Sequence, residues 1–307
     1  MDFLIFVISI AILITGADMV IRSTNALALK LNISHLLVGA FLVAIGTSLP
    51  EMGIAMQANN QNKSDLAMAI IVGSSILNLT LIFGSIFIFS KSVSIKQECF
   101  TQDSLWLLAA LTLFVLALFD HSISYFDALI IVLLMGAYTL FIFESSQKSR
   151  GELFQEILKS SLSLPYALML FGGGIILLVV GAIFTVDSTS DIASRLNLNE
   201  WQSGILMIAF ATALPELILS ILAVYKDKIE IAIANIIGST ISNLTLVLAL
   251  VASINPITID LSKHLFDLTV MLVASLIVIG MIITKSYNRY IALSLFLILA
   301  LFIEAQF

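Results

Sequence analysis

The sequence has few charged residues for its length. Of its 307 residues, 11% are charged and 60% are hydrophobic, and the mean hydropathy is +1.11. A soluble domain could not cover its surface with so few charges, so much of the apolar surface must face lipid. We therefore expect the bulk of the chain to lie in a lipid bilayer.

Cysteine and histidine are scarce as well. The single Cys99 excludes an intramolecular disulfide. His35, His121, His264 and Cys99 all fall near predicted loops, which argues against a zinc enzyme at membrane depth, because such a site normally uses His or Cys ligands. The net charge of −6 comes without a basic run, so nothing indicates a nucleic-acid partner. We expect neither an enzyme nor a bound cofactor.

Long hydrophobic runs are what the sequence does contain. A helix that spans a bilayer needs about 20 mostly apolar residues. Ten runs meet this length approximately, with short connections, and they predict an all-α membrane protein with ten transmembrane helices. The runs are 3–21, 34–58, 65–89, 104–119, 125–143, 164–184, 201–224, 229–253, 266–284 and 290–303.

The two halves of the sequence repeat each other. Adding 165 to a residue number in the first half gives its counterpart in the second half, without gaps. About 18 of the 43 positions in 39–81 are identical to their counterparts, and they include Pro, Glu, Gly, Ser and Asn. Each half has five helices, an odd number, so the second copy enters the membrane upside down, as in many secondary transporters. We expect five-helix repeats at 1–143 and 164–307, joined by a loop at 144–163.

Lys and Arg are unevenly distributed between the two sets of predicted loops. Eleven of the fourteen fall in one set and three in the other. Because positively charged loops stay in the cytoplasm, this asymmetry places the 144–163 loop inside and both termini outside. We expect a multi-pass protein of the cell (inner) membrane.

Each repeat carries one glutamate in the middle of a predicted span, Glu51 and Glu216. A charge at this depth is costly and therefore usually functional. Each glutamate directly follows a proline, Pro50 or Pro215, which removes a backbone donor and frees the carbonyl one turn earlier. We expect local unwinding at both prolines to release neighbouring carbonyls, which can line a cavity and bind a cation.

The following predicted helix in each repeat supplies neutral polar side chains. Ser74 and Asn78 are four residues apart and share one helix face, and Ser239 and Asn243 repeat the arrangement. The glycine before each serine allows close helix approach. Such residues also serve as hydrogen-bonding contacts between membrane helices. As a symmetric set beside two glutamates, they favour an oxygen-rich site for Ca²⁺ or Na⁺.

These segments resemble the alpha repeats of the cation/calcium exchanger superfamily. Residues 46–51 with 73–78 resemble the first alpha repeat, and 212–216 with 238–243 resemble the second. The resemblance implies ten helices, outward termini, and exchange of Na⁺ for Ca²⁺ by alternating access. Its implied ion ligands, together with the side chains above, are Glu51, Glu216, Thr47, Thr212, Ser48, Ser74, Asn78, Ser239, Asn243, and the carbonyls of Ala44 and Ala209.

Two residues depart from the pattern of the superfamily. Ala213 stands where Ser is usual, and Asn243 stands where many members carry Asp. The site then has a charge of −2, which one Ca²⁺ neutralises and several Na⁺ could replace. The missing hydroxyl keeps Ca²⁺/H⁺ antiport open, because a buried carboxylate can take up a proton. A cation channel is the other alternative. We expect the chain to function as a monomer.

Overall fold

The computed structural model describes residues 2–31, 38–90, 98–148, 162–195, 199–287 and 289–307, and these parts of the chain are almost entirely helical. Several spans combine α-helical and π-helical (η) segments. The elements of the first half are α1 (Asp2–Leu31), η1 (Val38–Val43), α3 (Ala44–Thr47), α4 (Leu49–Asn60), α5 (Ser64–Leu77), η2 (Asn78–Ile82), α6 (Phe83–Phe89), α7 (Glu98–Ala117), β1 (Ser122–Ile123) and α8 (Tyr125–Lys148).

The second half has the same kinds of elements in the same order along most of its length. They are α10 (Leu164–Arg195), α11 (Glu200–Gln202), η4 (Ser203–Ile208), α12 (Ala209–Tyr225), α13 (Ile229–Ser242), η5 (Asn243–Val247), α14 (Leu248–Ile254), β2 (Ile257–Thr258), α15 (Leu261–Ile283) and α16 (Arg289–Glu304). The short strands β1 and β2 pair antiparallel and link the turn after α7 to the turn before α15.

Helices of membrane-spanning length account for most of the described chain. Seven are long and apolar enough to cross a bilayer, and an eighth results if the bent pair Ala40–Thr47 and Leu49–Asn60 counts as one span. The predicted runs 104–119 and 290–303 also fall on helices, but the apolar part of the first is only the shorter Gln102–Ala117. The chain is therefore a helical membrane protein with seven or eight candidate spans by this measure in its described residues, and the expected count of ten stays a prediction.

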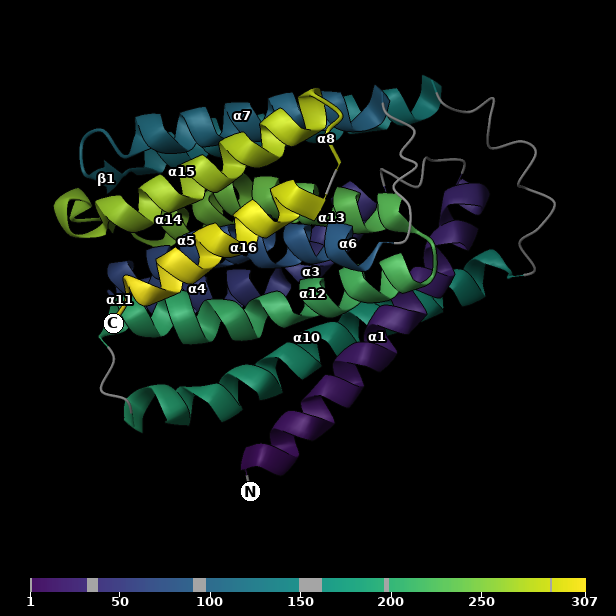
Figure 1. Ribbon diagram of the computed structural model, residues 1–307, viewed down its shortest axis with the longest axis horizontal. Coiled ribbons are helices and arrows are strands. Elements are labelled where there is room, and N and C mark those ends of the chain that lie inside the picture. The colour runs from purple at the N-terminus through teal and green to yellow at the C-terminus, as the bar shows by residue number, and fades with distance from the viewer. Residues whose placement is uncertain (1, 32–37, 91–97, 149–161, 196–198, 288) are drawn as a thin grey trace.

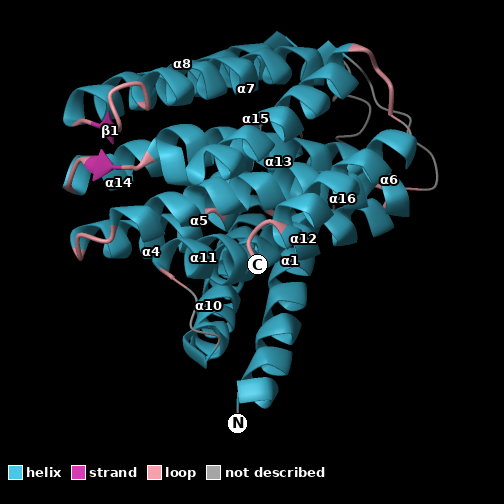
Figure 2. Cartoon of the chain, turned by 60° about the vertical axis from the view of Figure 1, so that its left-hand side comes forward, coloured by secondary structure: helices cyan, strands magenta, loops and turns pink. Residues whose placement is uncertain are grey.

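Helices α1 and α10 form a long crossing pair that extends beyond the packed body of the other helices (Figures 1 and 2). They cross at small residues. A Cβ added to Gly16 would lie 2.8 Å from the carbonyl oxygen of Gly174, and the reverse substitution gives the same distance. Across the same pair, the Thr185 hydroxyl donates to Ser9 Oγ at 3.0 Å. Without side chains at the crossing, the two backbones come close, as is common between membrane helices.

Within the body, one helix of each half packs closely against the other half. A Cβ on Gly73 of α5 would lie 2.8 Å from Ala209 Cβ, and one on Gly238 of α13 would overlap the backbone of Ala40. The close approach expected of these two glycines is confirmed. The central helices α5 and α13 are consequently enclosed by the chain, and most of their residues are buried.

The repeat in sequence is matched by the boundaries of the elements. Helices α5 and α13 have 14 residues each and start 165 positions apart. The π-helical segments η2 and η5 follow them directly, with five residues each. Segments η1 and η4 likewise have six residues each, 165 positions apart. The same local sequence therefore produces the same local backbone twice.

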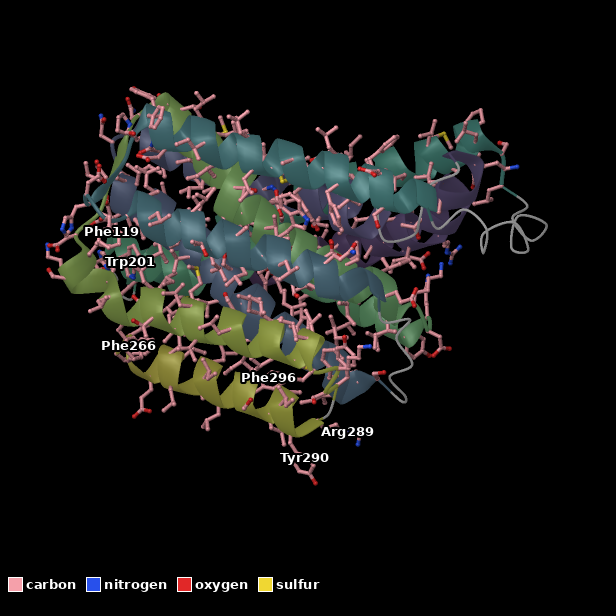
Figure 3. The ribbon with its side chains drawn as sticks, turned by 90° about the horizontal axis from the view of Figure 1, so that it is seen from above. Phe119, Trp201, Phe266, Arg289, Tyr290 and Phe296 are labelled. Carbon is pink, nitrogen blue, oxygen red and sulfur yellow. The ribbon has the colours of Figure 1, made fainter. Side chains whose placement is uncertain are left out.

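Large apolar side chains remain exposed on the outside of the body. Phe119 is 77% exposed and Tyr290 is 82% exposed, and they lie towards opposite ends of the helices (Figure 3). Phe266 projects from the outer face of α15 near the end that carries Phe119. Exposed aromatic residues at both ends of apolar helices are typical of a protein that sits in a bilayer.

The contact at Gly238 gives a test of the fold. We expect Gly238→Ala to destabilise the protein by about 3 kcal/mol, the upper part of the range for overpacking, because the new methyl group meets backbone atoms of Ala40 and not a flexible side chain. Gly280→Ala is the matched control, since a Cβ there meets nothing within 4 Å. Thermal unfolding of the purified variants in detergent measures the difference, and equal melting temperatures would contradict this packing.

Candidate cation-binding site

The helix that carries Glu51 is broken directly before it. Segment α3 ends at Thr47, α4 begins at Leu49, and the axis bends by 48° between them. Pro50 lies in the first turn of α4 and cannot donate to the Gly46 carbonyl. Across the break, the Ser48 N–H still donates to the Ala44 carbonyl. The helix is thus interrupted beside the first proline, as expected, and the release of further carbonyls stays a prediction.

The helix that carries Glu216 behaves differently. Helix α12 runs without interruption through Pro215, so the expected unwinding at this proline is wrong. A proline removes only one backbone donor, and a helix can continue past that single loss when its surroundings support it. Only the carbonyl of Ala211 loses its partner through Pro215. The irregular backbone of the second half lies earlier, in η4.

The two glutamates are fully buried and lie close enough for their charges to repel each other. Glu216 is the better supported, because Ser239 Oγ donates to its Oε1 at 3.2 Å. Thr47 and Ser48 of the first half also face Glu216. Neither carboxylate oxygen of Glu51 has a hydrogen-bond partner in the described part of the chain.

The two asparagine side chains form symmetric hydrogen bonds between the halves. Asn78 Nδ2 donates to Ser239 Oγ at 3.3 Å, and Asn243 Nδ2 donates to Ser74 Oγ at 3.0 Å. The Ser48 and Ser239 hydroxyls are 2.8 Å apart and connect the halves again. Each amide thus uses its donor for the contact between halves and keeps its carbonyl oxygen free.

Acceptor oxygens without a donor gather in this region. Five of them are fully buried and accept no hydrogen bond from the described residues: both carboxylate oxygens of Glu51, Oε2 of Glu216, and the Oδ1 atoms of Asn78 and Asn243. A buried acceptor without a donor is costly, and a buried charge more so. A cation removes the cost for all five at once, and carboxylate and amide oxygens are ligands that hard cations such as Ca²⁺ prefer.

All the side chains proposed from the sequence are buried around this point. The eleven candidate residues are fully inaccessible to solvent, and contacts join members of both halves. The carbonyls of Ala44 and Ala209 already accept hydrogen bonds from the Thr47 and Thr212 hydroxyls, each at 3.2 Å. These two carbonyls are therefore less available than the side-chain oxygens. In the described chain, no three His, Cys, Asp or Glu residues gather as a metal cluster, so the acidic part of the site is limited to two carboxylates.

Two buried polar residues beside the site were missed from the sequence. Asn235 lies one turn before Ser239 on α13 and contacts Thr47, while Ser220 lies one turn after Glu216 on α12. Both are fully buried. Comparison of the repeats could have found them, because their counterparts are the apolar Ile70 and Ala55.

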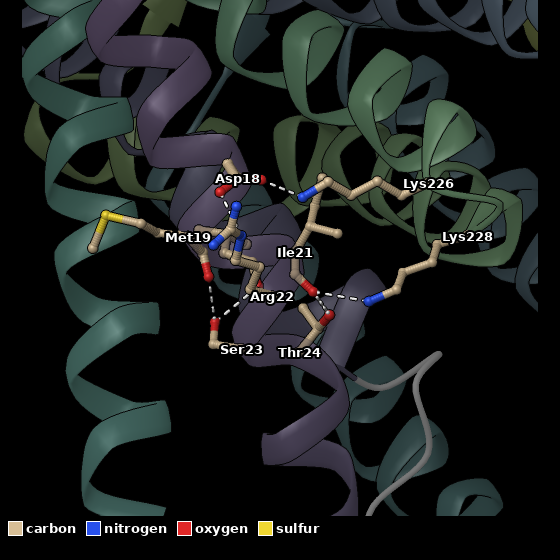
Figure 4. A network of polar contacts seen from close by, with 9 residues as sticks. Asp18, Met19, Ile21, Arg22, Ser23, Thr24, Lys226 and Lys228 are labelled. Atoms are coloured by element: carbon tan, nitrogen blue, oxygen red, sulfur yellow. Dashed lines mark hydrogen bonds and ion pairs between the residues drawn. The ribbon is translucent and has the colours of Figure 1, made fainter. Parts of the chain in front are cut away.

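Asp18 of α1 belongs to a separate cluster of ion pairs. It forms ion pairs with Arg22 on its own helix and with Lys226 after α12 (Figure 4). Lys228 donates to the Ile21 carbonyl at 3.1 Å beside this pair. The contacts tie α1 to the α12–α13 connection.

The fold and the site define a class: a multi-pass helical membrane protein in which two similar halves enclose a buried, oxygen-lined, acidic site. A family model described as "Sodium/calcium exchanger protein" matches residues 1–144 and 166–307, which is most of the chain. The chain belongs to the sodium/calcium exchanger family.

Individual relatives agree with this assignment. The chain is 28% identical to the inner membrane protein YrbG of Escherichia coli, over 89% of this chain and 86% of the relative. It is also 28% identical to the sodium/calcium exchanger MaX1 of Methanosarcina acetivorans, over 92% of this chain and 91% of the relative. A solved structure of the sodium-calcium exchanger NCX_Mj, soaked with Na⁺ and Ca²⁺, matches with a TM-score of 0.80 at 25% identity, covering 99% of this chain and 97% of that one.

Cation binding at this site predicts a specific pattern of thermal stability. We expect Ca²⁺ at 100 times its dissociation constant to stabilise the protein by about 2.7 kcal/mol, and we expect Glu51→Gln to abolish this increase. Without Ca²⁺, the same variant should melt no lower than the parent, because it removes a buried charge that has no partner.

Glu200→Gln is the control for this experiment, since its side chain is 52% exposed and pairs with Lys63 outside the buried set. Melting curves measured with and without Ca²⁺ test whether Glu51 is needed for the stabilisation by Ca²⁺. A Glu51→Gln variant that Ca²⁺ still stabilises fully would contradict the assignment of Glu51.

The Asp18 contacts predict only a small effect on stability. Both Asp18 and Lys226 are more than a quarter exposed, so solvent weakens the pair, and we expect Asp18→Asn to cost no more than about 1 kcal/mol. The loss should shrink further in high salt. Thermal unfolding at low and high ionic strength measures both effects, and a large loss that ignores salt would show that Asp18 has a different role.

Proposed function

We propose that this chain is a secondary active antiporter that exchanges Na⁺ for Ca²⁺ across the membrane by alternating access. Membership of the sodium/calcium exchanger family supports the reaction. The single structural observation that carries it is the group of five buried acceptor oxygens without donors, drawn from both halves. Such a group suits a cation as the missing partner, whereas a scaffold would be destabilised by it.

The charge of the site supports exchange between these two ions. Two buried carboxylates near each other carry −2, which one Ca²⁺ neutralises in a single step. Several Na⁺ can carry the same charge when they are spread over carboxylate, amide, hydroxyl and carbonyl oxygens. Because either set of ions satisfies the site and an empty site is costly, ion exchange is favoured over the return of an empty carrier.

In this proposal Glu51 and Glu216 bind Ca²⁺ together with the carbonyls of Thr47 and Thr212. The side-chain oxygens of the serines and asparagines complete the set for Na⁺: Ser48, Ser74, Asn78, Ser239 and Asn243. The Ala44 and Ala209 carbonyls remain part of the proposed Na⁺ ligands, although each already accepts a bond.

The proposed architecture is the one expected from the repeat. Ten spans form inverted five-helix units at 1–143 and 164–307, joined by the 144–163 loop on the cytoplasmic side, with both termini outside an inner membrane. The monomer is the functional unit, and lipid surrounds it. Helices α1 and α10, which cross at glycines and extend beyond the body, slide against the core to open the site to alternate sides.

Transport by the reconstituted protein tests this function. We expect proteoliposomes loaded with Na⁺ to take up ⁴⁵Ca²⁺, and we expect the uptake to collapse when the outward Na⁺ gradient is removed. Glu216→Gln should reduce the uptake at least tenfold, since it removes half of the charge that binds Ca²⁺. Uptake that ignores Na⁺ but follows a pH gradient would replace Na⁺ with H⁺ as the driving ion, and ion current without counter-transport would indicate a channel.

Ala213 gives a second test within the same assay. The residue is buried and stands where the repeat partner Ser48 has a hydroxyl. We expect Ala213→Ser to lower the Na⁺ concentration needed for half-maximal exchange, because it adds one oxygen ligand. Exchange of Ca²⁺ for Ca²⁺ in Na⁺-free medium serves as the internal control and should change little. An unchanged Na⁺ requirement would show that the position does not contact Na⁺.

A further inference from the structure

The two halves differ in polarity one helical turn away from the glutamates. In the second half this level carries Ser220 on α12 and Asn235 on α13. Their repeat counterparts in the first half are Ala55 and Ile70, which are fully buried and apolar. The same fold therefore packs well with apolar residues at this level, so packing alone does not require the polar pair.

The pairing of α12 with α13 places the two polar residues at the same level. The Ser239–Glu216 hydrogen bond fixes the antiparallel register of these helices. Ser220 follows Glu216 by one turn, and Asn235 precedes Ser239 by one turn, so both move the same distance towards the α12–α13 connection. Together, Ser220 and Asn235 form a second level of polar side chains, one helical turn closer to the α12–α13 connection than the carboxylates.

One polar atom of each residue at this level lacks a hydrogen-bond partner in the described part of the chain. Ser220 Oγ and Asn235 Nδ2 are buried and form no hydrogen bond. Asn235 Oδ1 is 3.5 Å from the hydroxyl of Thr47, the residue at the break before Glu51. An unsatisfied buried polar group destabilises the fold, so this level is unfavourable unless a ligand or water completes it.

The level lies on one side of the site only. It faces the α12–α13 connection, which carries Lys226 and Lys228, and the corresponding level towards the α4–α5 connection is the apolar one. By the distribution of Lys and Arg, the α12–α13 connection is cytoplasmic. An ion that leaves the carboxylates would thus meet neutral oxygens on the cytoplasmic side and apolar side chains on the opposite side.

We propose that Ser220, Asn235 and Thr47 form an additional binding position for a monovalent cation, Na⁺, between the central site and the cytoplasm. This inference rests on the proposed Na⁺/Ca²⁺ exchange. The three side chains offer neutral oxygens, which suit a singly charged ion that retains some water. A divalent ion normally requires carboxylates to offset its lost hydration, and this level has none. Asn235 Nδ2 remains available to donate to a retained water.

The test uses variants that copy the first half into the second. Asn235→Ile and Ser220→Ala install the residues found at the counterpart positions. We expect each to raise the half-saturating Na⁺ concentration several-fold at the cytoplasmic face, in proteoliposomes of known orientation. The half-saturating Na⁺ at the opposite face, and Ca²⁺/Ca²⁺ exchange without Na⁺, should stay within about twofold of the parent.

The matched control is Ser275→Ala, which removes another fully buried serine from α15, where its hydroxyl bonds only to the Met271 carbonyl. It should leave Na⁺ dependence unchanged at both faces. Ser220→Ala keeps the test decisive if Asn235→Ile does not fold. Unchanged Na⁺ dependence, or an equal change at both faces, would overturn the proposal. Failure of the proposed function is visible separately, because the parent protein then shows no Na⁺-driven Ca²⁺ flux.

Discussion

The rest of the structure depends on two buried carboxylates whose oxygens the protein itself leaves largely without donors in the described chain. Glu51 and Glu216 are fully inaccessible, and the donors around them satisfy only one of their four carboxylate oxygens in the described chain. In a medium of low dielectric, such a pair is stable only when a cation or a proton joins it. Under the proposed function, the need for a cation accounts for two glutamates at this depth and for the replacement of one kind of ion by another.

The site exists only because the two halves complete each other. Glycines on α5 and α13 let each helix approach the backbone of the opposite half, and the asparagine amides then reach serines across the boundary. The amide donors hold the halves together, and in the described chain the amide oxygens are left without donors. The same residues thus produce the close packing contact and the proposed binding site. The symmetry is incomplete, because α12 continues through Pro215 whereas the first helix breaks at Ser48.

Sequence reasoning succeeded where side-chain chemistry alone decides the outcome. A glycine beside a polar stripe serves a close contact, so the role of Gly238 was recognisable without coordinates, whereas the roles of Glu51 and Glu216 stay predictions. Sequence reasoning failed where the outcome depends on how distant segments pack around a residue. A proline removes one donor in either helix, but whether the backbone then breaks is set by the packing around it. Asn235 was overlooked because a single buried amide is ordinary until its missing partner is known.

By itself, the sequence determined the apolar helices and the repeat at a spacing of 165, and it predicted the oxygen ligands. These features follow from local composition and from the cost of placing a charge in lipid, and both can be assessed without the tertiary structure. Only the tertiary structure decided which oxygens lack donors in the described chain, that the Ala44 and Ala209 carbonyls are already engaged, and that Ser220 and Asn235 are buried with polar atoms left without partners. Hydrogen-bond satisfaction is a property of contacts between distant segments, so the sequence of either segment could not specify it.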